Sequence, residues 1–355
     1  MEINFRHNSH ISKIKRIFGK RNTKTPKLRL DMAERAINFP DSLFSNFKDS
    51  LSQEDFICYP CFDDYNNIKA RLASELLVPE NNIMLGNGSD YLIRSIFQAV
   101  CAKDTNVISP TPGFPMYKVY AETFESNFLG IDFDTNLNIS VESLLFQVNK
   151  KTRLVVLANP NSPFGDLKSI QELEYICYEL NKKNILFLLD EAYVDFINFS
   201  GIELIKKFDN LIITRTFSKA WGAAGCRVGY AVSQPQNIEF LEKLRLTFSL
   251  TMPSIKYINF LLDHIPEIKK YISEVNDSKS SIVNILKEDL KVQHGHVNWI
   301  HIENKNIESV LNKNKISYKS NINFLYKNCE NWIRLCITPG MENENYISEI
   351  TKRNK

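Results

Sequence analysis

The sequence predicts an α/β fold, with a large domain built on a mainly parallel, seven-stranded sheet and a smaller α+β domain after it. Between residues 83 and 232, short β-rich runs alternate with longer helical patterns. Several runs are apolar throughout, such as LVVLA at 154–158, which is typical of strands buried on both faces of a parallel sheet. After about residue 250 the pattern changes to long polar helices followed by strand-like pieces, which indicates the second domain.

The predicted elements follow in chain order. The strands of the large sheet are expected at Ile83–Leu85, Val107–Ser109, Phe128–Ile131, Leu154–Ala158, Ile185–Asp190, Leu211–Thr214 and Val228–Val232. Helices are expected between them, for example at Asp90–Ala102 and Ser169–Lys182. The smaller domain is expected to contain helices at Ser254–Leu262 and Glu267–Leu290 and strands at Val297–Ile302 and Trp332–Thr338.

The length and composition are those of an ordinary globular protein. The chain has 355 residues, of which 43% are hydrophobic and 24% charged, and this excludes low-complexity and wholly disordered classes. We expect residues 1–40 to form an N-terminal arm and part of the small domain. Residues 41–250 are expected to form the large domain, and residues 251–355 the rest of the small domain.

The charge balance and the cysteines restrict the partners and the compartment. With 44 basic and 41 acidic residues the net charge is +3, which gives no nucleic-acid footprint for the chain as a whole. No apolar run reaches the roughly 18 residues of a membrane-spanning helix, so no membrane partner is expected. The seven cysteines are odd in number and scattered, and the start of the chain lacks a signal-peptide core, so we expect a cytoplasmic protein.

Two segments have an unusual composition. From Arg6 to Arg29 the chain is basic and contains no acidic residue, and residues 7–18 could form an amphipathic helix. This arm is expected to pack over the body or over a partner subunit, and the alternative is a membrane-surface or targeting segment. The segment Asn304–Asn331 is rich in Asn and Lys, and we interpret it as solvated surface.

The strongest chemical signal is the run TFSKAWGAAGCRVGY at 216–230. Lys219 follows a predicted buried strand and lies among small and apolar residues, where desolvation favours the neutral amine that attacks a carbonyl. Arg227 follows a Gly-rich turn and could bind an oxyanion through two parallel hydrogen bonds. Either residue alone would be equally consistent with a loop lysine or a surface arginine.

The second signal is DEAY at 190–193, where the carboxyl end of an apolar strand reaches the edge at which open α/β sheets bind ligands. A carboxylate such as Asp190 must be paired there, and a protonated ring nitrogen is one suitable partner. Tyr193 could donate to a phenolic oxygen. The alternative is that Asp190 only caps the next helix.

Three further segments follow predicted strands. LGNGSD at 85–90 places two glycines at a helix start, which suits an anion, although such turns are common. NPNSPFG at 159–165 forms a rigid turn that presents side-chain amides, and TPGFPMY at 111–117 places Phe114 where its ring could stack on a planar cofactor or simply pack in the core. The pair Cys58 and Cys61 has no second pair for a metal or redox site, so no metal is expected.

Together these segments resemble the fold-type I pyridoxal 5′-phosphate (PLP) enzymes, and within them the histidinol-phosphate aminotransferase-like group. The resemblance extends from about Leu30 to Gly340. It implies the PLP-transferase fold, PLP as cofactor, a homodimer, and a small-molecule amino donor and carbonyl acceptor as reaction partners. The run from Lys219 to Arg227 and the run from Asp190 to Tyr193 are specific in combination, and the other segments support them.

The resemblance also implies roles for single residues. Lys219 would hold PLP covalently and move a proton, Asp190 would pair with the ring nitrogen, and Tyr193 would bond O3′. Phe114 would stack on the ring. The cofactor phosphate would be bound by Ser89, Asp90, Ser218, Arg227 and, from the neighbouring subunit, Tyr59. Arg334 matches the arginine that binds the substrate α-carboxylate.

Two departures from the family pattern bear on the site. The turn NPNSPFG replaces NPNNPTG, so the Asn that bonds O3′ falls on Ser162, and either Ser162 or Asn161 takes its place. The segment 30–40 differs from the family pattern that borders the substrate pocket, and Arg35 stands where an unusual substrate anion could bind.

Three functions are compatible with these residues. The first is an aminotransferase that moves an amino group between an amino acid, with glutamate as the donor implied by the resemblance, and a small phosphorylated carbonyl compound. The second is a decarboxylase of a phosphorylated amino acid, similar to threonine-phosphate decarboxylase, which the cofactor residues alone do not separate from the first; a sugar- or polyol-phosphate transaminase also stays open. The third is a non-catalytic binding partner that uses the basic arm, and the retention of Lys219 argues against it.

Overall fold

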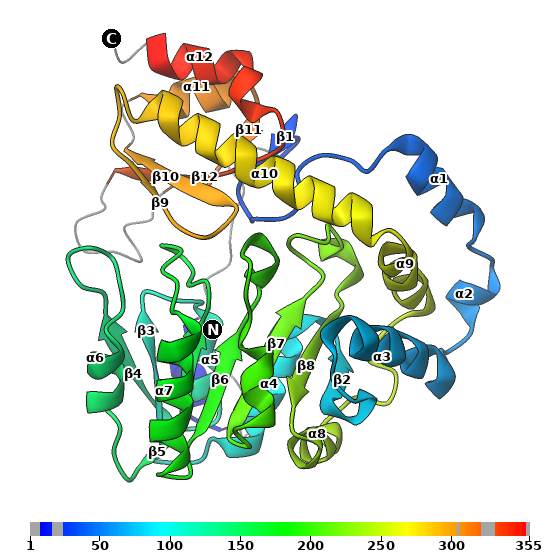
Figure 1. Cartoon of the computed structure of the whole chain (residues 1–355), viewed down its shortest axis with the longest axis vertical. Coiled ribbons are helices and arrows are strands. Elements are labelled where there is room, and N and C mark those ends of the chain that lie inside the picture. The colour runs from blue at the N-terminus through cyan, green and yellow to red at the C-terminus, as the bar shows by residue number, and fades with distance from the viewer. Residues whose placement is uncertain (1–7, 16–23, 304–305, 321–330, 353–355) are drawn as a thin grey trace.

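The computed structural model describes residues 8–15, 24–303, 306–320 and 331–352. Its helices are α1 (Asp41–Asp49), α2 (Glu54–Ile57), α3 (Phe62–Leu76), α4 (Gly88–Val100), α5 (Met116–Thr123), α6 (Val141–Phe146), α7 (Ile170–Asn181), α8 (Pro235–Glu242), α9 (Met252–Asp263), α10 (Ile265–Leu286), α11 (Ile307–Lys313) and α12 (Asn345–Lys352). Its strands are β1 (Leu28–Arg29), β2 (Ile83–Gly86), β3 (Asn106–Thr111), β4 (Asn127–Asp132), β5 (Thr152–Ala158), β6 (Leu186–Asp190), β7 (Leu211–Thr216), β8 (Gly229–Ser233), β9 (Val292–His294), β10 (Trp299–Glu303), β11 (Ile316–Ser317) and β12 (Trp332–Cys336). Figure 1 shows the large sheet in one layer with the small domain above it.

The large sheet has seven strands in the order β2-β8-β7-β6-β5-β3-β4. β8 alone runs in the direction opposite to the other six strands, so the sheet is mainly parallel. Each of the seven predicted strands overlaps one strand of this sheet, which confirms the predicted α/β class. The register places Ala158 beside Asp190 and Asp190 beside Thr214, so the carboxyl ends of three central strands meet at one edge.

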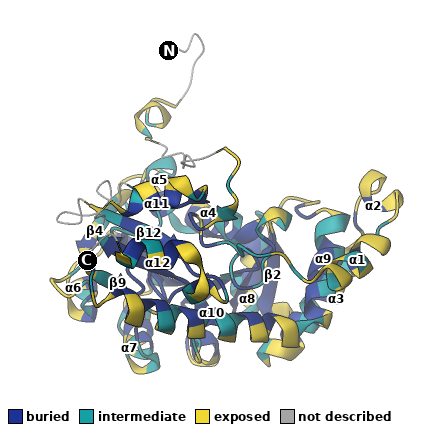
Figure 2. Ribbon diagram, turned by 90° about the horizontal axis from the view of Figure 1, so that it is seen from above, coloured by how far each residue is buried: buried dark blue, intermediate teal, exposed yellow. Residues whose placement is uncertain are grey.

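Helices cover both faces of the sheet, which is why its strands are apolar at successive positions. Leu157 and Leu189 pack in one core with residues of α3, α7 and α9. Val156 and Leu188 point to the other face and pack with residues of α4, α5 and α8. Figure 2 shows buried strands beneath helices whose outer faces are exposed.

The small domain has a core of its own. The sheet β12-β10-β9 is antiparallel, and α10, α11 and α12 bury apolar side chains against it. The N-terminal segment joins this domain, because β1 pairs with β11 and Leu30 lies in its core. Helix α10 spans both cores, with Ile268 in the first and Tyr271 in the second. The domain boundaries given above stay a prediction.

The structure changes two interpretations that were made from the sequence, one for residues 304–331 and one for residues 7–18. The segment 304–331 is more than solvated surface in its described part, because α11 and β11 bury Ile307, Leu311 and Ile316. The helix expected over residues 7–18 extends outside the described residues, and within them Ile11–Lys13 form one 3₁₀ turn. Beside this turn, the ring Nε2 of His10 lies 3.1 Å from the backbone O of Thr123, so the arm contacts the large domain there.

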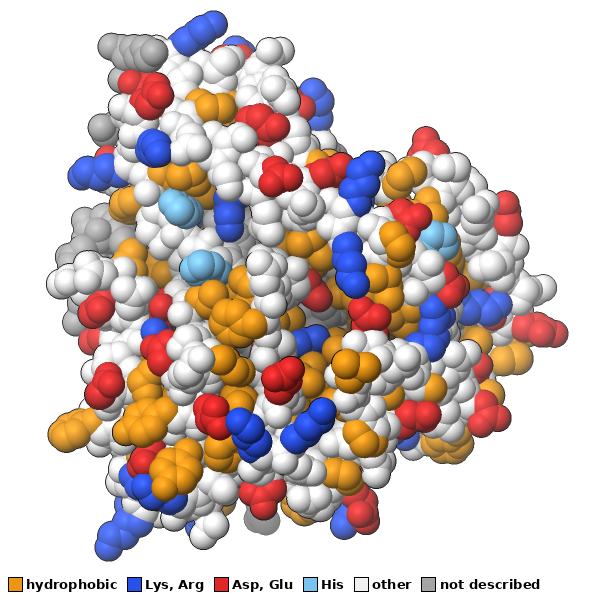
Figure 3. Space-filling view, viewed as in Figure 1, with side chains coloured by type: hydrophobic (Ala, Val, Ile, Leu, Met, Phe, Trp, Pro, Cys, Tyr) orange, Lys and Arg blue, Asp and Glu red, His pale blue; other side chains and the backbone are white. Residues whose placement is uncertain are grey.

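The surface matches the near-neutral net charge. Figure 3 shows basic and acidic side chains interspersed over the face in view, without a region of one sign. Among the parts of the chain that the structure describes, no helix has the length and apolar character needed to cross a bilayer.

Candidate active site

The carboxyl ends of β5, β6 and β7 and the start of α4 surround a cavity of about 220 Å³. Its lining comes from segments far apart in the sequence and consists of Ser89, Asp90, Phe114, Tyr117, Ala158, Ser162, Asp190, Ala192, Tyr193, Thr216, Ser218, Lys219 and Arg227. The structure therefore brings together all the cofactor residues predicted within one subunit except Asn161. Parallel strands make this convergence possible, because they all end at the same edge.

Asp190 is a buried carboxylate at the floor of the cavity. Burial raises its pKa to about 6, against hydrogen bonds that lower it. The shortest comes from Oη of Tyr117, 2.6 Å from Oδ2, and the backbone N–H of Ala192 donates to Oδ1 at 3.2 Å. These bonds fix the carboxylate but add no positive charge, so a cationic group that enters the cavity would meet an uncompensated acid.

The Lys219 amine enters the same cavity from the turn after β7. Its Nζ donates to the backbone O of Met32 at 2.8 Å and lies 5.6 Å from the centroid of the Tyr193 ring. The side chain is only half-buried, so its amine is accessible to a molecule in the cavity. An amine next to a phenol and opposite a buried carboxylate is suited to carbonyl chemistry.

One end of the cavity is suited to an anion. The thirteen-residue helix α4 begins at Gly88, and its amino end directs N–H groups and the positive end of its dipole here. Nη1 of Arg227 lies 3.4 Å from Oγ of Ser218. Gly88 has a φ of +77°, and a Cβ built on it would lie 2.8 Å from Nη2 of Arg227, so glycine keeps this space open. Asp90 is turned to the Tyr120 hydroxyl, which donates to its Oδ1 at 2.8 Å.

The turn after β5 places Ser162 and Asn161 differently with respect to the cavity. Ser162 lines the cavity, whereas Asn161 does not. The Oδ1 of Asn161 is buried and accepts no hydrogen bond within the described structure. Phe114 also lines the cavity and meets the Tyr117 ring edge-on, with centroids 5.4 Å apart.

The two predicted substrate arginines lie in different places. Arg334, on β12, donates from Nη2 to the backbone O of Asp31 at 2.8 Å, and its Cζ lies 5.0 Å from the Trp299 ring centroid. Neither Arg334 nor Arg35 is among the residues that line the cavity, although Arg334 bonds the carbonyl next to that of Met32, which accepts from Lys219. Arg35 lies between two aromatic rings. Its Cζ lies 4.0 Å and 3.8 Å from the ring centroids of Phe39 and Tyr271, and burial lowers its pKa.

Tyr59 does not line the cavity of its own chain. It is 78% exposed and stacks on Phe248 with ring centroids 4.3 Å apart. The thiols of Cys58 and Cys61 on either side are free and exposed. Within the described ranges no group of three or more His, Cys, Asp or Glu side chains could hold a metal ion.

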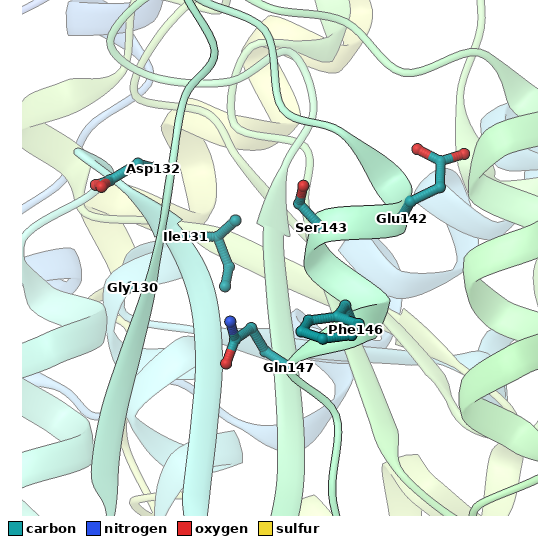
Figure 4. A pocket seen from close by; sticks show the side chains of 7 residues that line it. All are labelled: Gly130, Ile131, Asp132, Glu142, Ser143, Phe146 and Gln147. Atoms are coloured by element: carbon teal, nitrogen blue, oxygen red, sulfur yellow. The ribbon is translucent and has the colours of Figure 1, made fainter.

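The hollow beside α6 lacks this chemistry. This hollow, shown in Figure 4 and about 490 Å³ in volume, lies between the edge strand β4 and α6 and is lined by Gly130, Ile131, Asp132, Glu142, Ser143, Phe146 and Gln147. Its two charged residues are both acidic, and no amine or guanidinium faces it. It therefore cannot neutralise a phosphate or bind a carbonyl group covalently.

The profile of the family "Aminotransferase class I and II" matches residues 32–349, which is most of the chain. The chain belongs to the class I and II aminotransferases. The prediction of an aminotransferase of PLP fold type I is thereby confirmed, and the hypothesis of a non-catalytic relative is not needed.

The relatives of this aminotransferase agree with the predicted group. A "Histidinol-phosphate aminotransferase" of Christiangramia forsetii is 32% identical over 295 residues, which cover 79% of this chain and 81% of that protein. A "Dihydroxyacetone phosphate transaminase" of Campylobacter jejuni is 31% identical and covers 75% of this chain and 73% of that one. The solved histidinol-phosphate aminotransferase of Sinorhizobium meliloti, in complex with PLP, has the same fold, with a TM-score of 0.78, 22% identity and coverage of 92% and 90%.

Sequence reasoning missed some of the residues that form the cavity or support it. Tyr117 was quoted in the TPGFPMY segment without a role, although it lies three residues after Phe114 and one helical turn therefore places both at the cavity. Thr216 and Ala192 lie inside the two strongest quoted runs, but neither was given a role. Trp299, behind the cavity, belongs to a predicted strand, and only the fold shows what it touches.

Proposed function

We propose that this aminotransferase uses PLP to move an amino group between an amino acid, with glutamate as the first candidate, and a small phosphorylated carbonyl compound. One observation carries the proposal: the Lys219 amine, the buried Asp190 carboxylate and the anion-binding end at Arg227 face a single cavity. The names of the two relatives given above each specify a phosphorylated compound, and this supports a phosphorylated substrate.

The residues present fit PLP at both ends of the cofactor. The space kept open at Gly88 beside Arg227 suits the phosphate, and the buried Asp190, which lacks a cationic partner in the cavity floor, suits a protonated ring nitrogen. When bound, PLP supplies a protonated ring that takes up the electron pair left on the substrate Cα after its proton is removed.

The chain's own groups would act as follows. Asp190 holds a proton at the ring nitrogen, and the Tyr117 hydroxyl keeps the carboxylate oriented through its 2.6 Å hydrogen bond. Lys219 would hold the cofactor aldehyde and would serve as the base that moves a proton at the substrate Cα. Tyr193 and Ser162 would hold the cofactor at its O3′, and Phe114 would hold its ring face.

The substrate carboxylate would bind Arg334, in place of the Asp31 carbonyl that now accepts from its guanidinium. We expect Arg334→Ala to raise KM for amino-acid donors by about 10- to 100-fold, the equivalent of one charged hydrogen bond, with a smaller change in kcat. Initial-rate kinetics with glutamate and other amino acids measure this. Arg35→Ala is the comparison. A weaker effect is expected there, because the Arg35 guanidinium lies between two rings, whereas Arg334 bonds the carbonyl next to the one that accepts from Lys219. Unchanged KM for every donor in Arg334→Ala contradicts the assignment.

An amino-donor and acceptor screen tests the reaction itself. The PLP-loaded protein is offered glutamate with phosphorylated carbonyl compounds and with their unphosphorylated analogues, while glutamate consumption and carbon dioxide release are both followed. Glutamate consumption that requires a phosphorylated acceptor supports the proposal. Carbon dioxide release from a phosphorylated amino acid without any acceptor would instead identify the decarboxylase alternative.

A homodimer completes the proposal. The patch Phe56, Ile57, Tyr59, Phe62 and Phe248 exposes large apolar side chains on and near α2, of which Phe56 and Ile57 are 68% and 71% exposed. A second copy is the occupant that suits it, because the exposed Tyr59 would then reach the phosphate end of the neighbouring cavity.

The near-neutral surface and the six free cysteines among the described residues support the predicted cytoplasmic location.

Mixing inactive variants tests both the dimer and the role of Tyr59. Tyr59→Ala and Lys219→Ala subunits are each expected to be inactive or strongly impaired, whereas a co-refolded equal mixture should recover about a quarter of wild-type activity, because half of the dimers then have one intact site. Phe56→Asp should shift the mass in light scattering from a dimer to the 41.1 kDa monomer.

The control for the interface variant is Phe146→Asp, since Phe146 is 86% exposed on α6 at the opposite end of the molecule from α2. It should leave the mass unchanged. No recovery in the mixture, with both variants dimeric, would show that Tyr59 acts within its own subunit or not at all.

A further inference from the structure

We propose that Trp299 is a positioning residue of this aminotransferase, which sets where the turn that contains Ser162 stands against the cofactor. The inference rests on the proposed function, because it concerns the groups that would contact PLP. Trp299 is fully buried and is not among the residues that line the cavity, so it would act through its neighbours.

Three consecutive backbone carbonyls of the turn after β5 accept hydrogen bonds from the β9–β10 hairpin of the small domain. The donors and acceptors are Trp299 Nε1 to Pro163 O at 2.8 Å, Gln293 Nε2 to Phe164 O at 2.9 Å, and His296 N to Gly165 O at 2.9 Å. We call these three bonds the carbonyl clamp. They fix the backbone directly after Ser162, so the position of its hydroxyl depends on the small domain.

The two backbones approach each other without intervening side chains. Gly165 has a φ of +77°, and a Cβ built on it would lie 2.8 Å from Cα of Gly295 in the hairpin. Because neither backbone has room to shift toward the other, the carbonyl clamp leaves the turn little freedom.

Trp299 differs from the other two donors because its ring also contacts two predicted site residues. It meets the Tyr193 ring edge-on, with centroids 4.8 Å apart, and the Arg334 guanidinium carbon lies 5.0 Å from its ring centroid. One buried side chain thus touches the turn of Ser162, the phenol predicted to bond O3′, and the arginine predicted to bind the substrate carboxylate.

The serine at position 162, where the family pattern has asparagine, makes the position of this backbone important. A serine hydroxyl is shorter than the asparagine amide of the family pattern, so it reaches O3′ only if the backbone brings it there. The carbonyl clamp supplies that constraint through uncharged groups. The Gln293 amide oxygen faces Nδ1 of His301 at 2.7 Å, and burial lowers the pKa of that histidine to about 3, so its ring is neutral.

The experiment uses the full-length PLP-loaded enzyme and the variant Trp299→Phe, which keeps a ring against Tyr193 but removes the N–H donor. We expect PLP to bind about tenfold more weakly, the effect of one buried hydrogen bond. We also expect the pH midpoint of the absorbance of the lysine-bound cofactor to shift by about half a unit or more, because O3′ loses a donor. The control is Trp332→Phe, the same change on the neighbouring strand β12. The Trp332 ring packs against Phe164 of the same turn, a contact that phenylalanine keeps, and within the described chain its N–H makes no hydrogen bond to that turn, so neither value should change.

A double-mutant cycle with Ser162→Ala separates positioning from general destabilisation. If Trp299 acts through Ser162, Trp299→Phe adds no further shift of the midpoint in the Ser162→Ala background. A wild-type midpoint and affinity in Trp299→Phe, or a shift of the same size in both backgrounds, overturns the proposal. If Trp299→Phe does not fold, Gln293→Leu removes the other side-chain bond of the carbonyl clamp, and a wild-type midpoint there is the contrary result. Wild-type protein that forms no lysine-bound cofactor would contradict the proposed function instead.

Discussion

Lys219→Ala is expected to lower transamination by at least about 10⁴-fold and to abolish the covalent attachment of PLP. The physical reason is that the cavity then has no primary amine to bond the cofactor aldehyde or to move the substrate proton, since Lys219 is the lysine among its lining residues. Borohydride reduction of the loaded enzyme followed by peptide mass spectrometry measures the attachment, and initial rates measure the reaction.

Lys279 is the control, because its amine has a lowered pKa but lies outside the cavity. Burial lowers the pKa of Lys279 to about 8, which makes its amine more available than an ordinary lysine. Its Nζ, however, donates to the backbone O atoms of Gly295 and Val297 and does not face the cavity. Lys279→Met should therefore retain the attachment at Lys219. A reduced adduct on any other lysine, with Lys219 unmodified, would end the proposed function.

The large sheet was predictable because both of its faces are covered. Strands such as Leu154–Ala158 must then be apolar at successive positions, and this signal survives in the sequence without knowledge of their partners. The candidate site was predicted from the same pattern, because Asp190 ends one buried strand, Lys219 lies three residues after another, and parallel strands end at one edge.

What escaped prediction depends on contacts between distant segments. The pair β1 and β11 is two residues long on each side, too short for any periodicity, and helix α11 was hidden by the Asn and Lys residues around its few apolar positions. Trp299 and Tyr117 look like core residues from sequence, because burial and aromatic character are the same for a residue that only fills space and for one that donates to Pro163 or to Asp190.

Asp190→Asn is expected to have opposite effects on stability and on catalysis. In the cofactor-free protein the carboxyl pKa is raised to about 6, compared with about 3.9 for an unfolded chain, because the ionised form is buried. The native state then binds the Asp190 proton more tightly than the unfolded state does. The Asp190 contribution to the free energy of unfolding falls as pH rises from about 4 to 6, and above pH 6 the ionised group costs about 3 kcal/mol.

The asparagine amide removes this cost, since it is neutral and can still meet the Tyr117 hydroxyl and the Ala192 N–H. We therefore expect cofactor-free Asp190→Asn protein to be more stable than wild type at pH 8, by up to about 3 kcal/mol in urea unfolding, and to match it near pH 4. Transamination should nevertheless fall by about 10²- to 10³-fold, because no carboxylate holds the proton at the ring nitrogen. Asp166→Asn is the matched control, since that acid pairs with Lys168 at 3.0 Å outside the cavity and its loss should destabilise the protein. An Asp190→Asn protein that keeps full activity would mean that the buried carboxylate serves the fold and has no part in the reaction.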